Sequence, residues 1–310
     1  MTAVAAKKKY YRSLEPLVQP EARPRPLDWA GIFGRRAPLE AEIGFGNGEY
    51  LARHSLAHPE RDYVGVEVAW ASAKRALRRL AAPPRPNVRI ILEKAQVALA
   101  RFFAPESLAV CRILFPLPWP EEKRAPRRLS QRDFLNLAAS RLTPDGLFIL
   151  VTDNPDLAEW TMAQARNSAL ALTLTERPAG LDTKYERKWE EGGRRLFHYL
   201  TGGKTFQPDL PPPGEIDMHA HYRPDLDPAA FRPRGEAAPE LVVRFNEFIY
   251  DSGRNEGLLR TFVVEGHLTQ DFYIRLRRET DGRWKVSPAA PARLYPTEGV
   301  ARALALAAAG

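Results

Sequence analysis

Short apolar runs alternate with amphipathic stretches from residue 38 to about residue 153. The runs have strand length and are rich in β-branched or large apolar residues, which predicts strands at Leu39–Ile43, Tyr63–Val68, Val88–Leu92, Leu108–Phe115 and Leu147–Thr152. The stretches between and after them have helical spacing, which predicts helices at Glu49–Ala57, Ser72–Ala81, Ala95–Phe103, Arg127–Leu142 and Asp156–Ala169. Such alternation is typical of an α/β protein whose mostly parallel sheet is covered by helices.

Two further strands, Leu170–Thr175 and Arg195–Leu200, are predicted on either side of a polar loop that contains Thr183 to Glu191. They would complete a seven-stranded sheet. Ligands of open α/β sheets bind outside the carboxyl ends of the strands, so motifs at those ends carry most of the functional information.

The chain beyond residue 206 has a different pattern. Residues 207–240 are crowded with proline and lack helical or strand periodicity, which indicates a linker. Alternating runs with intervening turn signals then predict four strands: Leu241–Tyr250, Leu258–Glu265, Phe272–Arg278 and Arg283–Val286. We therefore expect a basic arm at 1–36, an α/β domain at 37–206, the linker, and at 241–310 a small antiparallel β appendage with a terminal helix from Glu298.

The charge distribution points to a polyanionic partner. The formal net charge is +8 and the pI is near 9.6. Residues 1–36 hold eight lysines and arginines against three acids, a net charge of +5, together with Tyr10, Tyr11 and Trp29, whose rings can stack on bases. A basic solvated surface without a partner is the alternative interpretation.

Other classes of protein are disfavoured. No stretch approaches the ~18 apolar residues of a membrane-spanning helix, and the N-terminus lacks an apolar run followed by a cleavage site. The single cysteine, Cys111, excludes an internal disulfide and a zinc site built on cysteines. His219 and His221 have the spacing of a metal pair but lie in the proline-rich linker with no obvious further ligands. We expect a cytoplasmic protein with no membrane association and no metal.

The first predicted strand runs into E-I-G-F-G-N-G at 42–48, immediately before a helix. Gly44, Gly46 and Gly48 permit backbone conformations closed to other residues and let a ligand approach the main chain. A dinucleotide fingerprint would place its third glycine at position 49, which is Glu49. Glu42 adds negative charge where a pyrophosphate would be repelled. The turn therefore favours a cationic sulfonium cofactor, and a merely tight βα turn is the structural alternative.

Three more strand ends or loops carry motifs. Glu67 ends the second strand, where a carboxylate can accept both ribose hydroxyls, a device that NAD-binding folds share. The fourth strand runs into L-F-P-L-P-W-P at 114–120, whose prolines force an extended backbone around Leu117. The basic stretch E-E-K-R-A-P-R-R at 121–128 follows, so a substrate should bind there. The loop T-K-Y-E at 183–186 is also charged, and a solvated loop is its alternative interpretation.

Together these segments resemble the bacterial tRNA (guanine-N7)-methyltransferase family. The likeness covers about residues 38–204 and includes, besides these motifs, T-D at 152–153. The resemblance implies a Rossmann-like methyltransferase fold, S-adenosyl-L-methionine as cofactor, and tRNA as substrate, methylated at N7 of a guanosine in the variable loop. It assigns cofactor binding to Glu42 and Glu67, with the glycines of the turn, and the target guanosine to Asp153, Thr183, Lys184, Tyr185 and Glu186.

The chain departs from the family pattern at three positions. Leu117 replaces the aspartate regarded as the active-site residue, Lys94 replaces a third cofactor contact, and Glu121 replaces a lysine, so no catalytic residue can be assigned. Guanine N7 carries a lone pair and no proton, so transfer can rest on alignment, worth ~7–11 kcal/mol in well-oriented systems. Nearby acids that could contact the guanine instead are Glu121, Glu122, Asp153 and Glu186.

Three alternatives stay open at this point. Leu117 and Lys94 favour a non-catalytic RNA-binding protein that retains the fold, whereas intact Glu42 and Glu67 oppose it. A methyltransferase for another RNA position or for protein is the second alternative, and a nicotinamide oxidoreductase is the third. The sequence leaves undetermined the tRNAs used, the role of residues 207–310 and the oligomeric state.

Overall fold

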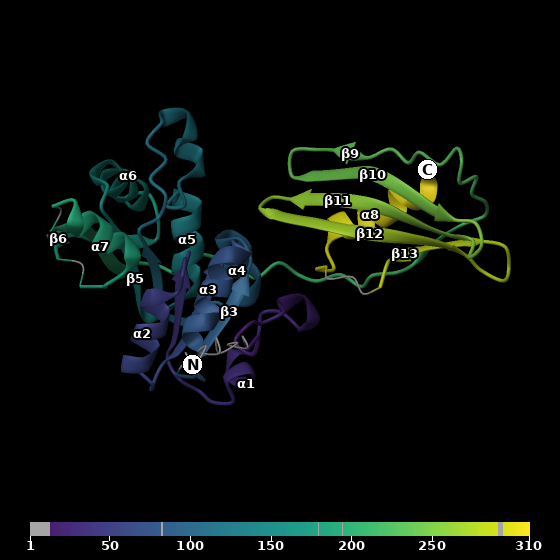
Figure 1. Cartoon of the computed structure of the whole chain (residues 1–310). Helices are drawn as coiled ribbons and strands as arrows, with labels where there is room; N and C mark the ends of the chain where they lie inside the picture. Colours follow the sequence, from purple (N-terminus) through teal and green to yellow (C-terminus); the bar gives the residue numbers. More distant parts are fainter. Residues whose placement is uncertain (1–12, 82, 179, 194, 291–293) are drawn as a thin grey trace, which may run out of the picture. The chain divides into compact units, whose positions relative to one another are not determined.

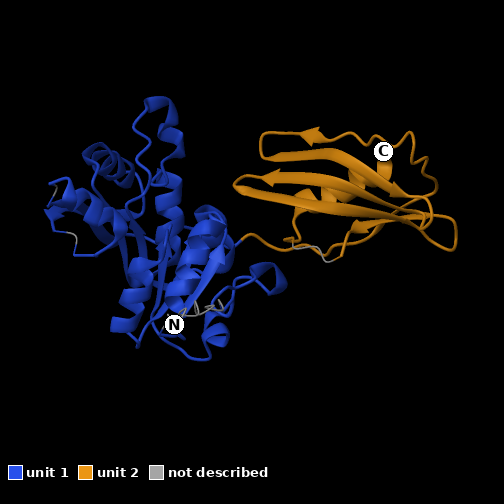
Figure 2. Ribbon diagram, viewed as in Figure 1, with its two compact units in different colours: residues 1–212 blue, residues 213–310 orange. Residues whose placement is uncertain are grey.

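The computed structural model describes residues 13–81, 83–178, 180–193, 195–290 and 294–310. The chain divides into two compact units, residues 1–212 (unit 1) and residues 213–310 (unit 2), which Figure 2 colours separately. Residues 1–12 of the basic arm lie outside the described residues.

Unit 1 is built on the expected seven-stranded sheet, with strand order β3-β2-β1-β4-β5-β7-β6 (Figure 1). Its strands are β1 Leu39–Ile43, β2 Asp62–Glu67, β3 Val88–Leu92, β4 Leu108–Leu114, β5 Leu142–Thr152, β6 Leu170–Arg177 and β7 Phe197–Lys204. All neighbours pair in parallel except β7, which runs antiparallel to β5 and to β6. The predicted mostly parallel α/β class is confirmed.

Helices connect the strands of unit 1. They are α1 Trp29–Phe33, α2 Glu49–Ala57, α3 Trp70–Leu80, α4 Ala95–Phe102, α5 Arg132–Arg141, α6 Pro155–Ala165 and α7 Lys184–Glu191, with short 3-10 turns η1 Pro20–Ala22 and η2 Glu122–Arg127. The helix predicted from Arg127 begins only at Arg132, because Arg128 and Gln131 adopt extended backbone conformations. Leu142 starts β5 because it pairs with Leu108 at the beginning of β4.

The prediction of a polar loop containing Thr183 to Glu191 is wrong, because residues Lys184–Glu191 form α7. Thr183 accepts the Glu186 N–H through its hydroxyl at 3.2 Å, and the Glu186 carboxylate accepts the Thr183 N–H at 3.4 Å. This reciprocal capping box satisfies two amides that the first helical turn leaves without partners. The T-x-x-E spacing was its signal in the sequence.

Unit 2 is an antiparallel sheet with one helix on its face. The strand order is β8-β13-β12-β11-β10-β9, and the bounds are β8 His221–Arg223, β9 Glu236–Ala237, β10 Leu241–Asp251, β11 Glu256–Glu265, β12 Leu268–Arg278 and β13 Trp284–Pro288. The helix α8, Glu298–Ala309, buries Val300 and Leu304 against Val263 and Ile274 of the sheet. The short edge strands β8 and β9 lie in the stretch expected to have no regular structure.

None of the described helices is both long enough and apolar enough to cross a membrane.

A cluster of buried charged side chains lies on one face of the sheet of unit 1. Glu40 and Glu42 alternate along β1 and so share one face, and both are at most 5% exposed. Arg112 of β4 pairs with Glu42 in the strand register, but its guanidinium donates to Glu40 Oε2 at 2.9 Å. Arg61 donates to Glu40 Oε1 at 2.6 Å from a more exposed position. Arg112 is therefore the buried cation that compensates this face of β1.

We predict that Arg112→Met lowers the free energy of unfolding by about 3–5 kcal/mol, because it removes the buried cation that pairs with the Glu40 carboxylate. Urea unfolding of parent and variant measures the difference. Arg61→Ala is the matched control, since the Arg61 side chain is 39% exposed, against 8% for Arg112, and its loss should cost only about 1 kcal/mol. Equal losses in the two variants would contradict a special role for Arg112.

Candidate functional site

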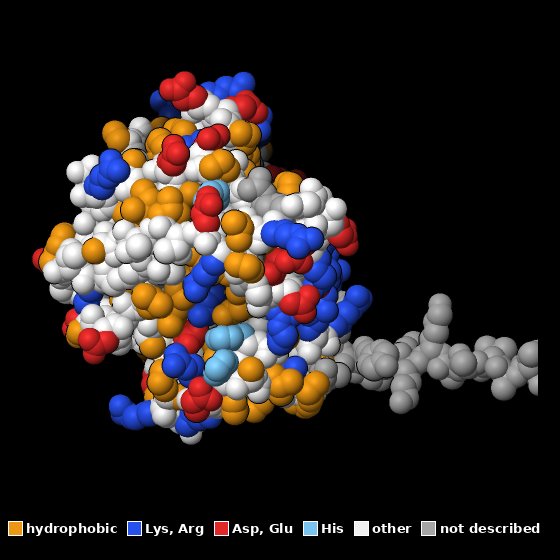
Figure 3. Space-filling model, turned by 90° about the vertical axis from the view of Figure 1, so that its left-hand side faces the viewer, with side chains coloured by type: hydrophobic (Ala, Val, Ile, Leu, Met, Phe, Trp, Pro, Cys, Tyr) orange, Lys and Arg blue, Asp and Glu red, His pale blue; other side chains and the backbone are white. Residues whose placement is uncertain are grey.

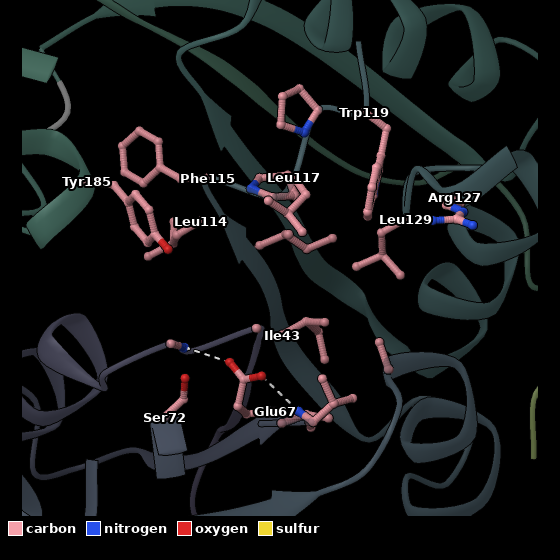
Figure 4. A pocket seen from close by; sticks show the side chains of 18 of the residues that line it. Ile43, Glu67, Ser72, Leu114, Phe115, Leu117, Trp119, Arg127, Leu129 and Tyr185 are labelled. Carbon is pink, nitrogen blue, oxygen red and sulfur yellow. Dashed lines mark hydrogen bonds between the residues drawn. The ribbon is translucent and has the colours of Figure 1, made fainter. Parts of the chain in front are cut away.

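A cavity of about 630 Å³ opens at the carboxyl ends of β1, β2, β3, β4 and β5. Its floor is apolar, including Ile43, Ile113 and Leu114, and Figure 4 shows Glu67 and Ser72 on one side with Tyr185, Leu117 and Trp119 on the other. The remaining polar lining residues are Glu93, Lys94, Gln96, Arg127, Asp153 and Lys188. This is the edge of the sheet at which the sequence motifs were expected to meet.

The glycines of the turn at 44–48 have two different roles, one in leaving room for a ligand and one in helix packing. Gly44 and Gly46 have φ of +73° and +56°, line the cavity, and have open space where a side chain would begin. Gly48 has φ of +71° but does not line the cavity, and a Cβ there would lie 2.6 Å from the Cβ of Ala76. Gly44 and Gly46 thus leave the main chain accessible, whereas Gly48 lets α2 approach α3.

The Glu67 carboxylate fixes this turn over the end of β2. It accepts the amides of Gly46 at 3.1 Å, Val68 at 2.8 Å and Ala69 at 3.0 Å, and Figure 4 draws two such bonds. An ionised carboxylate has about four acceptor positions, so one remains for a ligand hydroxyl. Glu67 therefore shapes the turn and can still contact a ligand.

Glu42 is buried beside the cavity rather than on its wall. Its Oε2 atom has no hydrogen-bond partner among the described residues, because Arg112 donates to Glu40 instead. Burial raises the pKa of Glu42 to about 8, and the Arg112 cation opposes this shift. An unsatisfied buried carboxyl of this kind is costly, and it can be stabilised by a cationic or donor group.

The lip of the cavity, residues Phe115 to Trp119, has a strained backbone. Phe115 and Trp119 have φ of +51° and +43°, a region that non-glycine residues rarely adopt. Arg128 donates to the carbonyl of Pro118 at 3.0 Å and to that of Trp119 at 3.2 Å, and its guanidinium lies 4.8 Å from the ring centroid of Trp160. The two hydrogen bonds hold the backbone of Pro118 and Trp119, both of which line the cavity.

Basic side chains surround the Trp119 ring. Arg127 and Arg124 lie 5.4 Å and 5.9 Å from its centroid. Leu117 is 68% exposed and lines the cavity, so position 117, at which the resemblance implies an aspartate, faces the cavity. The lip therefore offers an aromatic surface and cations, but no carboxylate at position 117.

The structure brings together only part of the site predicted from the sequence. Gly44, Gly46, Glu67, Asp153 and Tyr185 line one cavity. The other predicted site residues do not line it: Glu42, Gly48, Thr183, Lys184 and Glu186. Of the four acids considered as substitutes at position 117, only Asp153 lines the cavity.

Sequence reasoning missed several lining residues. Glu93 directly follows β3, so the strand-end rule alone could have identified it beside Lys94. Lys188 and Trp189 line the cavity with Tyr185, from which they are separated by three and four residues. That spacing puts all three on one helix face, a signal that depends on residues 184–191 forming a helix.

Among the described residues, no group of three or more His, Cys, Asp or Glu side chains has the geometry to hold a metal ion.

Comparisons with known proteins place the chain. A family described as putative methyltransferases matches residues 36–199. The tRNA (guanine-N(7)-)-methyltransferase of Thermus thermophilus is 32% identical over 266 residues, 83% of this chain and 84% of that protein. The protein of that name from Thiobacillus denitrificans is 40% identical over 57% of this chain and 78% of its own length. Its counterpart from Thermotoga maritima is 36% identical over 58% of this chain, which spans 59% of that protein.

The Thermus match is longer than unit 1, so it extends into unit 2. Among solved structures, an antibiotic-related methyltransferase aligns with 56% of this chain and 92% of its own, at 17% identity and a TM-score of 0.46. The assignment rests on the sequence matches. Because the matched family covers more than half of the chain and the Thermus relative matches along most of both lengths, the chain belongs to the bacterial tRNA (guanine-N7)-methyltransferase family.

Proposed function

We propose that the chain transfers a methyl group from S-adenosyl-L-methionine to N7 of a guanosine in the variable loop of tRNA. The observation that carries the proposal is one cavity that joins the glycine turn and Glu67 to an aromatic, basic lip. The names of the family relatives support the substrate. A tRNA substrate also supports a cytoplasmic location.

The residues of the cavity fit this cofactor. Gly44 and Gly46 leave room for an adenosyl group against the main chain, and Glu67 retains acceptor capacity for a ribose hydroxyl. The unpartnered Oε2 of Glu42 is suited to a cationic group such as the cofactor's ammonium. Glu93 is our candidate for the contact that Lys94 cannot provide, because it follows β3 and lines the cavity.

The bound cofactor would supply an electrophilic methyl group on a sulfonium. The chain's own residues have to bring the guanine into line with it, and a neutral nitrogen with a free lone pair requires no general base. Trp119 and Tyr185 offer rings on which a splayed-out base can stack. Asp153 can accept hydrogen bonds from the N–H groups of the guanine edge, which adenine lacks at N1 and C2.

The basic side chains around the lip suit the RNA backbone. Lys123 and Arg124 lie in η2 and pair with Glu121 at 3.1 Å and 3.5 Å, which leaves residues 121–128 a surplus of cations. Contacts of this type hold a nucleic acid without reading its sequence. The proposal thus assigns orientation to the cavity and affinity to its surroundings.

We predict that purified protein incubated with unmodified tRNA and labelled cofactor produces N7-methylguanosine, identified by nucleoside analysis after digestion. Alignment in the cavity is sufficient for this product because N7 is the unprotonated nucleophile. Methyl on another base would retain the enzyme class and reject the specificity. Tight tRNA binding with no transfer would show a non-catalytic RNA-binding protein.

We predict that cofactor binding near pH 7 releases a proton from Glu42. The pKa of the buried carboxyl is about 8, so it is mostly protonated at pH 7, and an approaching cation lowers that pKa. Cofactor affinity should therefore rise from pH 6.5 to 8 and level off above. Titration calorimetry in buffers of different ionisation enthalpy measures the released protons. Glu42→Gln should abolish the release, and equal release from both proteins would refute the assignment.

A further inference from the structure

The sequence singled out Glu49 because it stands where a dinucleotide fingerprint would have a glycine. The structure places its side chain, 14% exposed, between the glycine turn and α7. Glu49 Oε1 accepts from Arg79 of α3 at 2.9 Å, and Oε2 accepts the Lys184 N–H at 2.6 Å and Arg187 at 3.0 Å. One carboxylate therefore connects α2, α3 and the start of α7.

The same network reaches the cofactor turn. Arg79 also donates to the carbonyl of Asn47, inside the glycine turn, at 3.0 Å. On the other side, Arg187 and Arg53 both bind the carboxylate of Asp182, the residue before the helix cap, at 2.6 Å and 2.7 Å. Figure 3 views the molecule from the side on which α2 and α7 lie in Figure 1, and basic and acidic side chains are interspersed there.

The contact with Lys184 matters because of its place in α7. The first amides of a helix have no partner within the helix, and the Thr183 hydroxyl satisfies only that of Glu186. Glu49 satisfies the amide of Lys184 from another element. The next residue is Tyr185, which lines the cavity and whose ring centroid lies 6.3 Å from that of Phe115. Glu49 thus fixes the backbone immediately before Tyr185, whose ring lines the cavity.

We propose that Glu49 is a positioning residue: it holds the N-terminus of α7, and with it Tyr185, in register with the glycine turn. The inference rests on the proposed function, since Tyr185 is the stacking surface for the target guanine. The carboxylate does not line the cavity. Its effect on methyl transfer passes through the peptide of Lys184 and the ring of Tyr185.

Charge and positioning make opposite predictions for Glu49→Ala. Removing a negative charge near an RNA-binding surface should strengthen attraction to phosphates. Loss of positioning should instead lower kcat about tenfold or more and raise the KM for tRNA, while the dissociation constant for the cofactor alone changes less than about threefold. Glu190→Ala is the matched control, because it removes an exposed charge from α7 that has no described partner.

The test combines steady-state kinetics with hydrogen exchange of residues 183–187 in the full chain. In Glu49→Ala the Lys184 amide should exchange about tenfold faster or more, whereas Glu190→Ala leaves it unchanged. Glu49→Gln keeps an acceptor oxygen and should recover much of kcat and of the amide protection. An inactive parent would refute the proposed function. Hydrogen exchange would still test the contact between Glu49 and α7, because it is measured without tRNA. Unchanged exchange in Glu49→Ala, or kinetics that match Glu190→Ala, would overturn the inference.

Discussion

Arg112 determines how charge is distributed under the site. Its guanidinium, buried below β1, donates to Glu40 and not to Glu42, although Glu42 is its neighbour in the strand register. The Glu40 carboxylate accepts hydrogen bonds from both Arg112 and Arg61, while Glu42 keeps an oxygen with no partner among the described residues. The fold therefore stabilises one buried carboxylate and leaves an oxygen of the adjacent carboxyl, at the strand end before the glycine turn, without a described donor.

Around this charge the site is built by backbone constraints rather than by reactive side chains. Glu67 binds the amides of the glycine turn, Arg128 binds the carbonyls of the strained lip, and Glu49 binds the first amide of α7. Each contact fixes one wall of the cavity from outside it or from its edge. Such an arrangement suits the proposed reaction, in which catalysis consists mainly of aligning guanine N7 with the methyl group, because N7 has no proton to lose.

Much of unit 1 could be predicted because its strands are buried runs that end in glycine or acidic residues. The order of the motifs at the ends of β1, β2, β4 and β5 gave the sheet edge and the cavity. The failures have local causes. The capping box of Thr183 and Glu186 converts a very polar segment into a helix, and its two side chains are among those that the resemblance assigns to the target guanosine.

Other features depend on tertiary contacts that no pattern contains. The partner choice of Arg112 is decided across two strands, and the left-handed backbone at Trp119 is held by a residue nine positions away. Glu93 satisfies the strand-end rule because it directly follows β3, whereas the family pattern points to Lys94. In unit 2, the edge strands β8 and β9 are too short to show periodicity against a proline-rich background.

We propose that transfer rests on positioning, with Asp153 and not residue 117 supplying the carboxylate that contacts the guanine edge. Single-turnover methyl transfer with saturating protein and cofactor tests it directly in parent, Leu117→Asp and Asp153→Asn. The account predicts that Leu117→Asp transfers at about the parental rate, while Asp153→Asn is slower by about ten- to a hundredfold, as for loss of a charge-assisted hydrogen bond. An inert parent that gains activity in Leu117→Asp, with no effect of Asp153→Asn, would contradict it.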